Sequence, residues 1–307
     1  MAPQTRDPHF DAYLMVDWSA NNSPKRGKDS IWYCFLERIA GTTQITTLEN
    51  PPTRHLAYAQ IHALLLDLAH RRRHTLVGFD FPYGYPRGFA QALKINSPSP
   101  WQAAWNLLSS RILDDENNRS NRFEAAAELN AALSAQPFPF WGCPANKQQK
   151  YLSSKHRIRH QPGMLPEFRF TERHNGTGSP QPAWKLSYPG SVGSQALLGI
   201  PHVHRLRFYP TLSAISQVWP FETGFQLTPR THRAWQILQA EIYPSINTWP
   251  PDPTECKDQA QVRGLAHYFA QQDETGHLAT LFAPPTGFSA AELHHITTEE
   301  GWILGVL

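Results

Sequence analysis

The sequence predicts an α/β protein with a mixed β-sheet flanked by helices and a large helical and loop-rich insertion. Two observations support this fold class. Short apolar runs rich in β-branched and aromatic residues alternate with longer segments that have the periodicity of amphipathic helices. Two of the apolar runs end in a carboxylate, Asp17 and Asp80. In open α/β sheets, the carboxyl ends of the strands face the crevice in which ligands bind.

The first part of the chain has the order strand, strand, strand, helix, strand. Gly41 separates the second strand from the third and fits a hairpin turn. The helix is expected from about Thr53 to Arg73, where a basic run suits the negative end of the helix dipole. The four predicted strands are residues 12–17, 30–37, 43–48 and 75–80.

The middle of the chain has a different character and is predicted to be an insertion. Ser99 and Pro100 form a favourable helix start, and helices are expected at 99–114 and 121–134. Residues 136–205 are dense in Pro, Gly, Trp and His and are predicted to be rich in loops.

Two segments within this loop-rich stretch carry functional hypotheses. Residues 147–174 hold seven Lys or Arg among aromatic residues, which is typical either of a nucleic-acid contact or of a solvated surface. The small residues of Gly190–Gln195 favour exposed backbone N–H groups that bind an anion at a helix start. This segment lacks the Gly-Lys-Ser/Thr of a P-loop.

The last part of the chain becomes regular again. An edge strand is expected at 217–224 because Pro220 does not suit a central strand, and a further strand at 235–245 carries Glu241. Asp258 opens a helix at 259–272, and Ser289 caps a last helix at 288–300. An apolar, strand-like tail follows at 302–306. The predicted division is 1–95 for the first half of the core, 96–203 for the insertion and 204–307 for the second half.

Composition restricts the class of protein. A net charge of +3 is too small to indicate a nucleic-acid partner by itself. The three cysteines, Cys34, Cys143 and Cys256, are far apart and indicate free thiols in a reducing compartment. The start of the chain has no apolar signal-peptide core, and no run of about 18 apolar residues is present. We therefore expect a cytoplasmic protein without a membrane span.

Four acids are the candidate catalytic residues: Asp17, Asp80, Glu241 and Asp258. Two strands that each end in an acid place like charges side by side, which is costly without a cation. Oxygen ligands of this kind favour Mg²⁺ or Mn²⁺. Taken singly, each acid also has a structural interpretation. Asp residues after strands and at helix starts are common turn and capping residues, and Glu241 fits an exposed edge strand.

This order of strands, helices and acids resembles the ribonuclease H-like superfamily. The segments VDWSA (16–20), GFDFP (78–82), EIYPS (241–245) and KDQA (257–260) resemble a family known as domain of unknown function 429, whose members are described as predicted nucleases. The resemblance covers about residues 12–95 and 200–275. It implies a ribonuclease H-like mixed sheet and a nuclease or phosphodiesterase that depends on divalent ions.

The resemblance also implies roles for these residues. Two ions ~4 Å apart would cut a phosphodiester bond, one activating water and the other neutralising the leaving oxygen. Asp17 would bridge the ions, Asp80 and Asp258 would each bind one, and Glu241 would bind an ion or orient water. The expected substrate is nucleic acid or a phosphorylated small molecule. The predicted substrate contacts are Trp18, Ser19, Lys257 and Arg263.

Other functions are weighed against this one. The fold also permits a non-catalytic binding protein of ligands or nucleic acid. Similar bacterial chains have been labelled as accessory proteins of cobalamin or molybdopterin guanine dinucleotide biosynthesis, although no residue here supports that chemistry. Sugar kinases and actin-like ATPases are disfavoured because Asp17 is not followed by a Gly-rich loop. The zinc spacing HExxH and the serine-hydrolase frame GxSxG are both absent.

Overall fold

The computed structural model describes residues 8–174, 180–228, 232, 234–246 and 253–307. The prediction that the chain has no signal peptide concerns residues 1–7, which lie outside the described residues. The described part forms a mixed six-stranded sheet with the order β3-β2-β1-β4-β6-β5. The strands are β1 (Ala12–Asp17), β2 (Trp32–Ile39), β3 (Thr42–Glu49), β4 (Thr75–Phe79), β5 (Ser216–Val218) and β6 (Ile237–Glu241). The predicted α/β class and mixed sheet are confirmed.

The strand directions bring the strand-end acids to one end of the sheet. β1, β2 and β3 are antiparallel neighbours, whereas β4 pairs in parallel with β1 and β6 pairs in parallel with β4. The hairpin between β2 and β3 turns at Ala40 and Gly41, which both have positive φ, as a two-residue type I′ turn requires. β5 is an edge strand, as predicted, but it ends at Val218 and does not extend over the predicted range 217–224.

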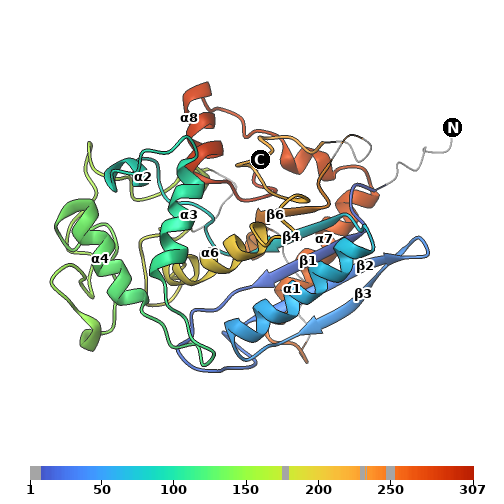
Figure 1. Ribbon diagram of the computed structural model, residues 1–307, viewed down its shortest axis with the longest axis horizontal. Coiled ribbons are helices and arrows are strands. Elements are labelled where there is room, and N and C mark those ends of the chain that lie inside the picture. Colours follow the sequence, from blue (N-terminus) through green and yellow to red (C-terminus); the bar gives the residue numbers. More distant parts are fainter. Residues whose placement is uncertain (1–7, 175–179, 229–231, 233, 247–252) are drawn as a thin grey trace.

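Helices cover both faces of the sheet. They are α1 (Arg54–His70), α2 (Phe89–Ala92), α3 (Pro100–Arg111), α4 (Arg122–Ser134), α5 (Phe170–Arg173), α6 (Gly193–Arg207), α7 (Lys257–Glu274) and α8 (Ala290–His295). Figure 1 shows α1 across one face of the sheet, α7 behind it, and α2, α3, α4 and α6 beside it, on the side toward which β1 points. No helix of the described residues is both long enough and apolar enough to cross a membrane.

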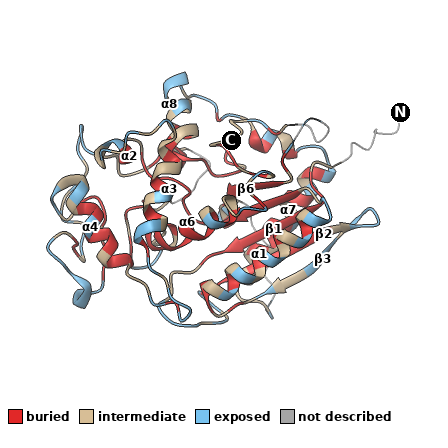
Figure 2. Cartoon of the chain, viewed as in Figure 1, coloured by how far each residue is buried: buried red, intermediate tan, exposed pale blue. Residues whose placement is uncertain are grey.

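Two apolar clusters hold these layers together. Leu14 and Val16 of β1 join α1, α3, α4 and α6 in one cluster, and Tyr13 and Met15 of the same strand join α7 in the other. Alternate side chains of a strand point to opposite faces, so a central strand covered on both faces is apolar along its length. All six residues of β1 are buried, including Asp17 (Figure 2). The insertion helices that share the first cluster therefore belong to the same apolar core as the sheet.

Most element predictions are confirmed within a few residues, and two need correction. α6 begins at Gly193, inside the stretch expected to be rich in loops, and crosses the predicted boundary at 203–204. Its helical state depends on packing that the local sequence does not show: Gly199 lies against the Phe81 ring, and Pro201 is accommodated within the helix. The apolar tail at 302–306 forms only an isolated bridge, between Ile303 and Glu241.

Candidate active site

Asp17 and Asp80 lie side by side at the carboxyl ends of two paired parallel strands. The backbone N–H of Asp80 donates to the carbonyl of Val16 (3.2 Å), which continues the pairing of β4 with β1 beyond Phe79. The carboxyls of Asp17 and Asp80 are within hydrogen-bonding reach of each other. The backbone N–H of Trp18 donates to Oδ1 of Asp80 (2.7 Å) and orients that side chain.

Asp258 reaches the same place from the first turn of α7. This helix packs on β1 and β2, which brings its amino terminus to the end of β1. Oδ2 of Asp258 accepts a hydrogen bond from the backbone N–H of Asp29 (2.6 Å), in the turn before β2. Within the described residues, none of Asp17, Asp80 and Asp258 forms an ion pair.

Burial raises the pKa values of all three carboxyls, and the charge of Asp258 adds to the rise at Asp17 and Asp80. Burial, followed by the charge and hydrogen bond of Asp80 and the charge of Asp258, raises the pKa of Asp17 well above its usual range. Burial also raises the pKa of Asp80 to about 7, although the hydrogen bonds from Trp18 and Asp17 oppose this rise. Burial raises the pKa of Asp258 as well. Asp17 and Asp80 therefore retain a proton to higher pH than ordinary aspartates do.

A cavity of about 460 Å³ opens beside these acids. Asp17, Ser19 and Asp258 contribute to its lining from the core, and Arg122 and Gln195 contribute from the insertion. The insertion thus forms part of the site.

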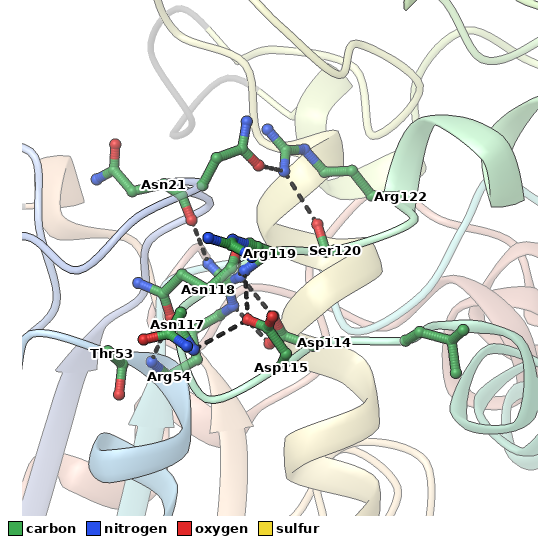
Figure 3. A network of polar contacts seen from close by, with 12 residues as sticks. Asn21, Thr53, Arg54, Asp114, Asp115, Asn117, Asn118, Arg119, Ser120 and Arg122 are labelled. Carbon is green, nitrogen blue, oxygen red and sulfur yellow. Dashed lines mark hydrogen bonds and ion pairs between the residues drawn. The ribbon is translucent and has the colours of Figure 1, made fainter.

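A buried arginine fixes the loop between Asp17 and this cavity. Nη1 of Arg54 donates to the carbonyls of Ser19 (3.1 Å) and Asn21 (2.8 Å), and two other nitrogens of its guanidinium bind Asp114 at 2.6 Å each (Figure 3). The backbone N–H of Arg54 donates to Oδ1 of Asn118 (2.8 Å). Arg54 belongs to α1, and Asp114 and Asn118 belong to the insertion, so this network attaches the insertion to the core next to the site.

Glu241 does not join the three aspartates, and its predicted place in the site needs correction. Both of its carboxylate oxygens bind the guanidinium of Arg169, at 2.7 and 2.6 Å, and the backbone N–H of Tyr83 donates to it (2.9 Å). Arg169 also binds Glu172 (2.5 Å). All three charged side chains are buried. A carboxylate held in this way by an arginine has no free oxygen to offer a metal ion.

The predicted substrate contacts separate into two groups. Ser19 lines the cavity, whereas the Trp18 indole packs against Phe79 in the core and is only 1% exposed. Arg263 is paired with Glu255 (2.6 Å), and Lys257 is exposed to solvent outside the cavity lining. The Trp18 ring and Arg263 thus have contacts within the chain, and the substrate contacts predicted for them stay predictions. Sequence reasoning missed Arg122, because a basic residue at a helix start has no distinctive local pattern.

The structure also shows which residues of the basic stretch at 147–174 are buried, and the state of the three cysteines. Arg169 and Phe170 are buried, so they cannot belong to a nucleic-acid surface, whereas the other six Lys and Arg of the stretch are exposed. All three cysteines are free thiols, as predicted.

The donor set suits a hard divalent cation by its chemistry, although the ligands are not arranged as a finished metal site. Carboxylate oxygens are the ligands that Mg²⁺ and Mn²⁺ prefer. The pKa values of Asp17 and Asp80 are raised in a place where a cation would relieve the crowding of their charges. Among the described residues, no three His, Cys, Asp or Glu side chains already converge on one point. The comparison of this chain with protein-family models, with curated proteins and with solved structures finds no match.

Proposed function

We propose that this protein is a hydrolase of phosphodiester bonds, a nuclease or related phosphodiesterase, that depends on Mg²⁺ or Mn²⁺. The observation that carries the proposal is the pair of strand-end acids Asp17 and Asp80, with Asp258 beside them and no ion pair to any of the three within the described residues. Buried acids that raise one another's pKa cluster at functional sites, because the arrangement is too costly to serve stability.

The element order supports a ribonuclease H-like core. Three antiparallel strands, a helix and a parallel strand follow one another, with acids after β1 and β4 and in the first turn of α7. This is the order on which the resemblance to that superfamily rests. The proposed site uses Asp17, Asp80 and Asp258, without Glu241.

Each residue has a defined task in this proposal. Asp17, Asp80 and Asp258 would hold the divalent ion, and its binding would compete with protonation of Asp17 and Asp80, whose pKa values are raised. A bound ion supplies positive charge and lowers the pKa of its bound water. The hydrogen bonds from Trp18 and Asp29 hold two of the carboxylates in place. Arg54 orients the loop that carries Ser19 into the cavity.

The decisive experiment compares Asp17→Asn with a matched exposed variant, Asp67→Asn on the surface of α1. We expect the wild-type chain to hydrolyse bis(p-nitrophenyl) phosphate or labelled single-stranded oligonucleotides with Mn²⁺, and Asp17→Asn to fall to background. Asp67→Asn should keep the wild-type rate. An unchanged rate in folded Asp17→Asn would refute the proposal. No hydrolysis and no Mn²⁺ binding by the wild-type chain would instead favour a binding protein on this fold.

A further inference from the structure

Arg122, at the start of α4, is buried without a carboxylate partner among the described residues. It is only 6% exposed. Its Nε donates to Oγ of Ser194 (3.0 Å), and its Nη1 donates to Oγ of Ser120 (3.1 Å) and to Oδ1 of Asn22, all of them neutral groups. Among the residues that the structure describes, Arg122 has no ion pair and its hydrogen bonds come from Nε and Nη1 alone. Because buried charges in proteins are ordinarily paired, this guanidinium is positioned for an anion that comes from outside the chain.

The neighbouring arginine makes the difference clear. Arg54 has a bidentate carboxylate partner in Asp114, whereas Arg122 at the edge of the same polar network has none (Figure 3). Burial and the positive charge of Arg54 lower the pKa of Arg122 to about 10, and the acids that oppose this are Asp114 and Glu124. The guanidinium remains charged at neutral pH in surroundings that an added anion would stabilise.

Arg122 is attached to the amino terminus of α6, a helix of 15 residues. In the first turn of this helix, the N–H of Gly193 donates to the carbonyl of Lys185 (2.9 Å). The N–H groups of Ser194 and Gln195 have no hydrogen-bond partner among the described residues. Free N–H groups at a helix start favour negative charge.

The local sequence explains how the helix start takes this position. A Cβ at residue 193 would lie 2.4 Å from the carbonyl oxygen of Ala183, so only glycine lets the helix approach the preceding segment this closely. Oγ of Ser194 donates to the carbonyl of Leu186 (2.6 Å) while it accepts from Arg122. The guanidinium and the first turn of α6 are therefore held together by direct contacts.

We propose that Arg122 and the first turn of α6 form an anion subsite that binds a phosphoryl group of the substrate. Arg122 and Gln195 line the same cavity as Asp17 and Asp258. A guanidinium with fixed N–H groups beside it suits the oxygens of a phosphate group. That the phosphoryl group belongs to a substrate rests on the proposed hydrolase function, whereas binding of free phosphate does not.

The test is calorimetric titration of inorganic phosphate into the metal-free protein at pH 7 and constant ionic strength. Arg122→Gln should weaken phosphate binding about tenfold or more, since charge-assisted hydrogen bonds are lost. Arg122→Lys should weaken it less, because the charge remains. The matched control Arg119→Gln removes an exposed arginine three residues away, outside the cavity lining, and should bind phosphate like the wild type.

The outcomes separate this subsite from the hydrolase. Unchanged phosphate binding in folded Arg122→Gln, or equal weakening in Arg119→Gln, would overturn the subsite even if Mn²⁺-dependent hydrolysis is found. Loss of phosphate binding in Arg122→Gln alone would establish the subsite even if no hydrolysis is found. Should Arg122→Gln not fold, phenylglyoxal modification of the wild-type protein decides: phosphate protects Arg122 from the reagent, or the subsite is refuted.

Discussion

Two clusters of acids lie at the same end of the sheet, and they differ in the charged side chains that contact the acids. Glu241, at the end of β6, meets the guanidinium of the buried Arg169, which also binds Glu172. Asp17 and Asp80, at the ends of β1 and β4, meet only each other and Asp258. In one cluster a buried arginine is ion-paired with the acids. In the other, the described residues form no ion pair with the acids, and the charges of Lys257 and Lys25 only oppose the rise in the pKa of Asp258.

The comparison shows that a strand-end acid is not by itself a functional residue. Both kinds of acid follow apolar strands and look alike in the sequence. Removing either partner of a buried acid–arginine pair destabilises the fold. Crowded acids without an ion pair, in contrast, themselves destabilise the metal-free fold. A cluster of crowded acids that lowers stability is expected where it serves a function. The proposed function therefore uses Asp17, Asp80 and Asp258.

The largest expected effect on stability is at the paired cluster. Glu241→Gln removes one charge of the buried Arg169 cluster, and breaking such a pair typically costs about 3–5 kcal/mol of unfolding free energy. Urea denaturation measures this loss, with the exposed Glu128→Gln as the control, which should change stability little. A stable Glu241→Gln variant without hydrolytic activity would restore Glu241 to the catalytic site and remove the contrast between the clusters.

A smaller effect is expected when a divalent ion is added. Mn²⁺ at 100 times its dissociation constant should stabilise the wild-type fold by about 2.7 kcal/mol, because it binds the folded state alone. The increase should be larger at pH 8 than at pH 6, since the ion competes with protons for Asp17 and Asp80, whose pKa values are raised.

Thermal unfolding measures this effect of Mn²⁺. Asp17→Asn should show no increase, and Asp67→Asn should show the wild-type increase. Equal stabilisation of all three proteins would mean that Mn²⁺ binds elsewhere on the chain.

The smallest expected effect is the stability of Asp17→Asn in the absence of metal. The raised pKa values mean that the folded protein binds more protons than the unfolded chain between about pH 4 and pH 7. The unfolding free energy of the wild type should therefore fall as the pH rises through this window. Asp17→Asn should reduce this fall in unfolding free energy, because it removes one of the shifted groups. The reduction is on the order of 1 kcal/mol for each unit by which that pKa is raised.

This prediction is tested by the difference in melting temperature between the two proteins as a function of pH. Asp17→Asn should equal the wild type near pH 4 and exceed it by a few degrees at pH 8. Other buried acids with raised pKa values, such as Glu300, contribute equally to both proteins and cancel in the difference. A variant that is less stable than the wild type at pH 8 would show that Asp17 serves the fold.

The sequence by itself determined the order of the strands and the positions of most helices. β1 shows continuous apolar character because both of its faces are buried, and Thr53 and Ser289 cap helices with their own side chains. Such signals are local: they depend on periodicity, caps and turns within a few residues. They also place Asp17 and Asp80 at strand ends and Asp258 at a helix start, which is as much of the site as a linear pattern contains.

Only the tertiary structure decided which acids lie close together and which side chains the buried arginines contact. Arg169 lies 72 residues from Glu241 along the chain, and Arg122 lies 72 residues from Ser194. No periodicity links residues so far apart. Whether a buried charge is neutralised depends on which distant side chain the packing brings within about 3 Å. The physical reason is that the cost of a buried charge depends on its neighbours in space, and the fold alone determines those neighbours.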